Sequence, residues 1–294
     1  MKIGYVAQNL TLDCSSARTF RLASYGDERL RQTVAMNLEC LGRILRFNVE
    51  HGIKLFRITS DLVPFASHPV CAVNWAREFA SDFAALGAYA REHDLRLSMH
   101  PGQYTLINSP QDSTYRASVS ELIYHATVLD SLGMDESHKI QIHVGGVYGD
   151  KPASMRRFVE RFHALPESVR RRLVIENDER LYSVADCALI WQETGAPILF
   201  DDFHFRLNTA GESFESAFNR AASTWDGRHG VPQVDYSSQE MDKRFGTHAA
   251  TIDEADFADF LDRIRGYDVD VMLEIKDKDR SALKALAIAR ERAA

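Results

Sequence analysis

Short apolar runs that end in a polar residue recur along the chain. The clearest is Leu173-Val174-Ile175, which stops at Glu176 and is followed by acids and an amide. A β-branched run of this length is typical of a strand that is buried on both faces. Five such runs end in a potential metal ligand, so we expect Glu176 to lie at the centre of a ring of ligands. The other four are Ser98-Met99-His100, Ile140-Gln141-Ile142-His143, Ile198-Leu199-Phe200-Asp201 and Val271-Met272-Leu273-Glu274.

Segments with helical spacing alternate with these runs. Leu30, Val34, Leu38, Leu41 and Leu45 recur at intervals of three and four, which predicts one face of a helix. The expected strands cover residues 3–7, 55–59, 96–100, 139–143, 173–176, 197–201, 233–236 and 270–274, and the seventh has the weakest pattern. The other expected helices cover residues 75–92, 114–132, 154–164, 183–193, 214–225, 255–265 and 279–292.

About eight strand–helix units without a linker predict a single-domain (β/α)8 TIM barrel over residues 1–294. The active site of this fold lies at the carboxyl ends of the strands. The alternative, a doubly wound open sheet, would spread the same side chains along an edge and would not support a shared metal cluster. The candidate ligands at the ends of the third to eighth strands are His100, His143, Glu176, Asp201, Asp235 and Glu274.

Two further histidines extend the candidate set. Asp201-x-x-His204 offers two ligands from one strand–loop junction, whereas His248, in Phe245-Gly-Thr-His248, is weaker and could simply cap a loop. A lone histidine or glutamate at a strand end is more often a hydrogen-bonding anchor than a ligand. The prediction of a metal site therefore depends on the recurrence of these residues together.

Imidazole and carboxylate donors together suit zinc, manganese or iron. Because a carboxylate has two oxygens, Glu176 could bridge two ions. Two ions roughly 3.5–4 Å apart stabilise the attacking and leaving oxygens of a phosphodiester hydrolysis and lower the pKa of bound water. Without a metal, the same residues would instead have strongly coupled titrations.

Charge qualifies this picture only slightly. The net charge of −7 argues weakly against a nucleic-acid partner, but bound divalent cations would reverse the sign inside a carboxylate-rich pocket. Lys276, Lys278 and Arg280 follow Glu274 at the predicted mouth and could meet phosphates, although ordinary surface charge is as good an explanation for any one of them.

The four cysteines, Cys14, Cys40, Cys71 and Cys187, are far apart in the sequence and form no CxxC pair. We interpret them as reduced thiols of a cytosolic protein. The chain opens directly into a predicted strand and contains neither a signal-peptide pattern nor an apolar run of membrane-spanning length. We therefore expect a cytoplasmic monomer with no membrane partner.

Several motifs, in this order along nearly the whole chain, resemble those of the UV damage endonucleases. They are Gly4-Tyr5 with Asn9, Ser67-His68-Pro69, Ser98-Met99-His100-Pro101-Gly102-Gln103-Tyr104, His143 with Gly145-Gly146, Glu176-Asn177-Asp178-Glu179, Asp201-x-x-His204 and Leu273-Glu274-x-Lys276-Asp277-Lys278.

The resemblance implies a (β/α)8 barrel related to apurinic endonucleases of the endonuclease IV type. It implies two or three divalent ions, manganese first, with zinc or magnesium as alternatives. It also implies damaged double-stranded DNA as the partner and hydrolytic incision by metal-activated water immediately 5′ to UV photoproducts, cyclobutane dimers and 6-4 photoproducts among them, and to further lesions.

The resemblance also assigns expected roles to single residues. Gln103 and Tyr104 match a pair that probes the duplex, and a planar ring with an amide on a loop tip could fill the gap left by flipped bases. Otherwise Tyr104 would be a partly buried loop aromatic. Tyr5, Asn9 and Lys276 complete the expected DNA contacts. The expected metal ligands are His100, His143, Glu176, Asp201, His204, Asp235, His248 and Glu274, and the expected catalytic residues are Glu176, Glu274 and His68, a histidine near the cluster.

The seventh predicted strand departs from the family pattern. The family usually has a Lys-x-His pair there, whose lysine can be carboxylated and whose histidine binds metal, whereas this chain has Gln233 and Asp235. Gln233 cannot be carboxylated, and Asp235 can still bind metal but adds negative charge. We expect the cluster to persist with altered metal preference or rate, which the double substitution Gln233→Lys and Asp235→His should reveal.

Two other functions fit parts of the same pattern. A two-metal sugar isomerase of the xylose isomerase type would use a similar ligand set and would need no DNA. A barrel with a degraded cluster could bind distorted DNA without cutting it.

Overall fold

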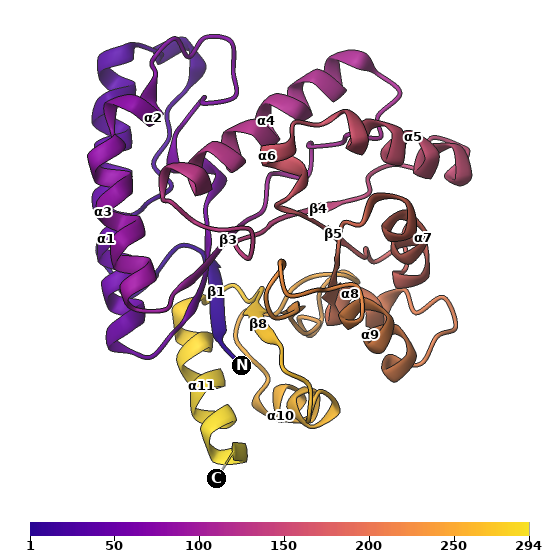
Figure 1. Cartoon of the computed structure of the whole chain (residues 1–294). Helices are drawn as coiled ribbons and strands as arrows, with labels where there is room; N and C mark the ends of the chain where they lie inside the picture. The colour runs from indigo at the N-terminus through magenta and orange to yellow at the C-terminus, as the bar shows by residue number, and fades with distance from the viewer. Residues whose placement is uncertain (294) are drawn as a thin grey trace.

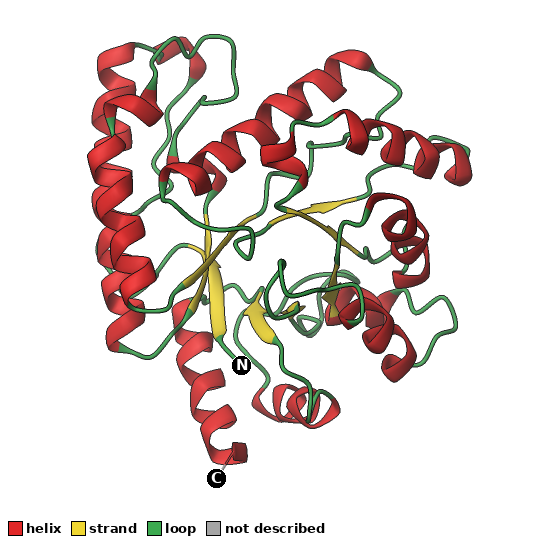
Figure 2. Cartoon of the chain, in the orientation of Figure 1, coloured by secondary structure: helices red, strands yellow, loops and turns green. Residues whose placement is uncertain are grey.

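The computed structural model describes residues 1–293, in which eight parallel strands close into one barrel in sequence order (Figures 1 and 2). The last strand pairs with the first, with Val271 opposite Ile3. This closed topology confirms the (β/α)8 prediction over the open sheet. The strands are β1 (Ile3–Ala7), β2 (Leu55–Ile58), β3 (Arg96–Met99), β4 (Ile140–His143), β5 (Leu173–Glu176), β6 (Ile198–Asp201), β7 (Gln233–Tyr236) and β8 (Asp270–Leu273).

The helices surround the strands, with α1 and α3 side by side along the left of Figure 1. The predicted apolar face of α1 is confirmed, because Leu30, Val34, Leu38, Leu41 and Leu45 are all buried. The helices are α1 (Asp27–Glu50), α2 (Trp75–Glu78), α3 (Ala80–Glu92), α4 (Asp112–Ser131), α5 (Lys151–Ala164), α6 (Glu167–Arg170), α7 (Val184–Thr194), α8 (Asp202–Leu207), α9 (Phe214–Ala222), α10 (Glu254–Arg263) and α11 (Asp279–Ala293).

One local prediction was wrong, and two short helices were not predicted. The helix expected over residues 75–92 breaks at Phe79, which has a φ of −104° and a ψ of 21°. The short helix α6 was not predicted. Neither was α8, which begins directly after β6 because the Asp201 side chain accepts a hydrogen bond from the backbone N–H of His204.

The barrel interior contains polar side chains from strands that are not neighbours. The amide of Gln233 on β7 donates to Ser98 on β3, and Arg57 on β2 donates to Gln141 on β4. Such contacts cross the lumen, which branched apolar residues fill in most barrels of this fold. The interior near the mouth is therefore a polar network rather than an apolar core.

The structure corrects the prediction of four reduced thiols. Cys14, in the loop after β1, forms a disulfide with Cys40 on α1, and their Cα atoms are 5.8 Å apart. Cys71 and Cys187 are free. Folding brings Cys14 and Cys40 together although 26 positions separate them in the sequence. Within residues 1–293, no helix has the length and apolar character needed to cross a membrane.

Candidate metal centre at the barrel mouth

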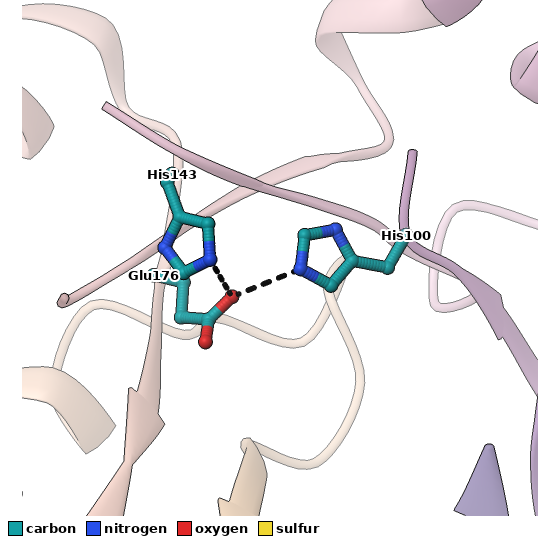
Figure 3. Close-up of side chains that lie close together, drawn as sticks. All are labelled: His100, His143 and Glu176. Atoms are coloured by element: carbon teal, nitrogen blue, oxygen red, sulfur yellow. Dashed lines mark ion pairs between the residues drawn. The ribbon is translucent and has the colours of Figure 1, made fainter. Parts of the chain in front are cut away.

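Glu176 lies at the centre of the predicted ring. It ends β5, is only 1% exposed, and its Oε2 faces two histidine rings at once (Figure 3). His100 Nε2 is 3.4 Å from that oxygen and His143 Nε2 is 3.5 Å from it. These separations exceed a normal hydrogen bond. They match the roughly 3.4 Å between two donors that each lie about 2.1 Å from one tetrahedral ion, so the three residues fit a divalent cation.

Protonation at this group also favours a cation. Burial opposes the charged form of Glu176, but His143 and two further histidines outweigh burial and hold its pKa well below the usual range. Burial lowers the pKa of His100 to about 4, against the attraction of Glu176. At neutral pH the ring of His100 is therefore uncharged, so one of its two nitrogens has a lone pair that can bind a cation beside the anionic carboxylate.

The other oxygen of Glu176 belongs to a second group, formed with Asp201 and His204. Glu176 Oε1 is 3.2 Å from His204 Nδ1. That nitrogen also lies 3.1 Å from the backbone oxygen of Asn177, an arrangement that orients the ring and leaves Nε2 for a ligand. Burial raises the pKa of Asp201 to about 8. Burial would lower the pKa of His204, but Asp201 and Glu176 outweigh burial and raise that pKa to about 11. A cation bound between these residues would take the place of the histidine's proton.

Glu274 and His248 complete the rim. His248 Nδ1 donates to the backbone oxygen of Glu274, and its Nε2 is 4.0 Å from Glu274 Oε2. Burial would raise the pKa of Glu274, but Arg57 outweighs it and lowers that pKa to about 2. The eight expected ligands thus meet at one mouth, as the sequence predicted, although their binding of metal stays a prediction.

Sequence reasoning missed Arg57, which lies in the middle of this network. Its guanidinium is buried and donates from Nη1 to Glu274 and from Nη2 to both oxygens of Asp235, at 2.7 and 2.8 Å. Gln141 donates to Glu176 at 2.6 Å and to Asp235 at 2.7 Å. A charged residue inside the apolar segment Leu55-Phe56-Arg57-Ile58 was the available signal.

The residues after Glu176 build the loop rather than the ring. Asn177 accepts from the backbone N–H of Asp201 and donates to its oxygen, both at 3.0 Å. Asp178 accepts hydrogen bonds from the backbone N–H groups of Arg180, Leu181 and Tyr182. These contacts fix the turn that directly follows Glu176.

A cavity of about 630 Å³ opens beside the ring, between the ends of β1, β2, β3 and β8. Lys276 is exposed, and Lys278 has a φ of +53°, which non-glycine residues rarely adopt. The cavity combines the Glu274 carboxylate and two histidines of the ring with cations that suit a phosphate. Its lining includes Arg57, His100, His248, Glu274, Lys276 and Lys278.

The Gln103 and Tyr104 side chains lie on an exposed loop after β3, and Tyr104 is 81% exposed. This position excludes the alternative of a partly buried aromatic and leaves the ring free to contact a partner. His68 is also exposed, and its Nδ1 accepts a hydrogen bond from the backbone N–H of Val70 at 3.0 Å. The expected catalytic role of His68 stays a prediction.

Tyr5 and Asn9 differ from expectation, because both are buried. The Tyr5 hydroxyl donates to Asn48 on α1 at 2.8 Å and accepts from Asn9 at 2.9 Å. Asn9 also accepts from two backbone N–H groups of the following loop, those of Thr11 and Leu12. These residues tie β1 and its loop to α1, and the structure leaves no surface of Tyr5 for a nucleotide.

Comparison with known proteins assigns the chain to a family. The family model described as UV-endonuclease UvdE matches residues 1–292. The chain belongs to the UvdE family. Among its relatives, a UV DNA damage endonuclease from Clostridium perfringens (strain 13 / Type A) is 36% identical over 288 residues, which are 97% of this chain and 70% of that protein. A protein of the same name from Bacillus cereus (strain Q1) is 34% identical over 97% of this chain and 93% of the relative.

Solved structures agree with the UvdE assignment. The crystal structure of SacUVDE has a TM-score of 0.96 and 42% identity, and the match covers 100% of this chain and 99% of the other. Endonuclease IV from Thermus thermophilus has a TM-score of 0.56 at 17% identity, with 86% of this chain and 95% of the other covered. An L-ribulose 3-epimerase has a TM-score of 0.58 at 17% identity, with 100% and 97% covered. The last two show the shared fold alone.

Proposed function

We propose that this UvdE-family chain is a DNA repair endonuclease that nicks double-stranded DNA immediately 5′ to UV photoproducts. The observation that carries the proposal is the ring around Glu176, in which each carboxylate oxygen faces histidine nitrogens. Relatives named UV DNA damage endonuclease support the choice of substrate. The sugar epimerases share only the fold at 13–17% identity, so no specific observation favours an isomerase.

The donor set supports a cluster of at least two divalent ions. His100 and His143 would hold one ion with Glu176, and Asp201 and His204 would hold a second with the same carboxylate. When bound, such ions supply positive charge for the phosphate oxygens and polarise a water molecule. Mixed nitrogen and oxygen donors suit manganese, which we expect first, with zinc or magnesium as alternatives.

The chain's own residues would bind and orient the DNA. Lys276 and Lys278 line the cavity beside the ring and would bind backbone phosphates. Gln103 and Tyr104 would enter the duplex at the lesion, where the damaged bases leave the stack. Because Tyr104 is exposed without DNA, this insertion would require little rearrangement of the loop.

An assay with irradiated plasmid tests the proposal. Purified protein is incubated with supercoiled DNA, irradiated or not, in the presence of EDTA, manganese, magnesium or zinc. We expect nicking of the irradiated plasmid with manganese and none with EDTA. A gel shift without nicking in any metal would identify a DNA-binding barrel instead, and conversion of a ketose or aldose would identify an isomerase.

A further inference from the structure

Arg57 lies where a third cation would lie. Besides the two groups that share Glu176, the mouth contains a third group of acidic residues, formed by Asp201, Asp235 and Glu274. Arg57 binds two of these three carboxylates directly, at Nη1 and Nη2. It comes from β2, whereas the carboxylates come from the ends of β6, β7 and β8, none of which pairs with β2.

Asp235 has little capacity left for a metal ion. Its Oδ1 accepts from Arg57 at 2.8 Å, and its Oδ2 accepts from Arg57 at 2.7 Å and from Gln141 at 2.7 Å. The Asp235 side chain is 0% exposed, and that of Arg57 is 5% exposed. An ion on Asp235 would have to displace a buried guanidinium or remain close to its positive charge, and both alternatives are unfavourable.

The two groups that share Glu176 include donor atoms that the Arg57 guanidinium does not engage. His100 and His143 present Nε2 to the carboxylate, and Asp201 Oδ2 has no hydrogen-bond partner within the described chain. Asp235 places a carboxylate inside the barrel, and the guanidinium of Arg57 remains charged and offsets it permanently. The mouth therefore contains two groups suited to a metal ion and one group whose charge an arginine neutralises.

We propose that Arg57, held by Asp235 and Gln141, takes the place of a third metal ion, so that this chain has a two-ion centre. Asp235 is then a positioning residue for Arg57 and not a metal ligand. Arg57 and Lys276 both line the cavity in which the phosphate is proposed to bind. The inference rests on the metal-dependent function proposed above and specifies how many ions that function uses.

Metal counting tests this without relying on activity. Each protein is loaded with manganese, dialysed, and analysed for manganese per chain by mass spectrometry, with folding checked by circular dichroism. We expect two ions for the parent and two for Asp235→Asn, because Asp235 is no ligand. Asp201→Asn, the matched control from the second group, should lose one ion.

Substitutions of Arg57 test whether its charge takes the place of a third ion. Arg57→Gln leaves Asp235 and Glu274 without their cation and should take up a third manganese ion, whereas Arg57→Lys keeps the charge and should remain at two. Three ions in the parent, the loss of one ion in Asp235→Asn, or only two ions in folded Arg57→Gln would each overturn the inference. If Arg57→Gln does not fold, the Asp235→Asn comparison alone decides.

The outcomes separate this inference from the proposed function. The expected ion counts with no nicking of irradiated DNA would retain the two-ion centre and reject the endonuclease. Nicking by a parent protein that holds three ions would retain the endonuclease and reject the two-ion centre.

Discussion

Asp235 shows the limit of reasoning from single residues. Its place at the end of a strand correctly predicted that it would lie in the mouth, but its partner Arg57 is 178 positions away. Burial and the nearby acids Glu274 and Glu176 raise the pKa of Asp235 against the attraction of Arg57. Which carboxylate is paired depends on side chains that meet across the lumen, and no local pattern carries that information.

Tyr5 is a second residue whose contacts could not be predicted from the local sequence. The sequence correctly placed it on the first strand, but the ring is buried and its hydroxyl donates to Asn48 on a helix that packs outside the barrel. The positions of the candidate ligands at the strand ends were predictable because strand periodicity and fold topology determine them. The contacts of Tyr5 and Arg57 were not, because packing between distant elements determines them.

The exposed loop after β3 leads to a prediction for Tyr104→Ala. Stacking of a base on an aromatic ring contributes about 1–3 kcal/mol, so we expect the preference for irradiated over intact duplex to fall roughly 5- to 150-fold. Incision kinetics on both duplexes measure this. Leu189→Ala, which removes another exposed apolar side chain, on the outer helix α7, is the control and should behave as the parent. An unchanged preference in Tyr104→Ala would exclude duplex probing by this ring.

At the scale of elements, the close packing of α3 against the end of α4 leads to a second prediction. A Cβ atom on Gly87 would lie 1.7 Å from the backbone oxygen of Leu132, which cannot move alone. Gly87→Ala should therefore lower the free energy of unfolding by about 2 kcal/mol or more, although alanine favours helices. Urea unfolding measures the change.

Gly42 on α1 is the matched control. Its added Cβ would lie 3.2 Å from Cδ2 of Leu86, a flexible side chain. Gly42→Ala should therefore change the free energy of unfolding by less than about 1 kcal/mol. Equal effects of the two substitutions would contradict the packing described for α3.

The start of β4 leads to a prediction about pH. Lys139 is fully buried and donates to His229 Nδ1 at 2.8 Å and to the backbone oxygen of Arg171 at 3.1 Å. Burial, with a contribution from Arg96, lowers the pKa of Lys139 to about 7. Between pH 7 and about 10.5 the unfolded chain then holds a proton that the folded chain lacks.

This difference makes the contribution of Lys139 to stability unfavourable below pH 7 and removes the penalty as the pH rises toward about 10.5. Parent stability should therefore rise relative to that of Lys139→Met across this window, by up to about 1.4 kcal/mol per pH unit. Urea unfolding of both proteins at pH 7, 8 and 9 measures the difference. Parallel pH profiles would show that Lys139 is charged in the folded protein.

At the scale of the whole molecule, the barrel brings histidines and acids from six strands or their ends to one rim. The sequence predicted this convergence because parallel strands in one barrel all end on the same side. It did not predict the Cys14–Cys40 disulfide, because the proximity of the β1 loop to α1 is a property of the folded chain. The fold and the convergence of the candidate ligands were thus predictable, and the pairings among buried groups were not.

Glu176 is proposed to hold the divalent ions that make phosphodiester hydrolysis possible. The most direct measurement compares the parent with Glu176→Gln on an end-labelled duplex carrying one photoproduct, with manganese and with circular dichroism as the folding control. We expect the parent to cut immediately 5′ to the lesion and the variant, though folded, to be slower by roughly 100-fold or more, because the carboxylate charge shared by both groups is lost. Parent-like cutting by Glu176→Gln would contradict the account.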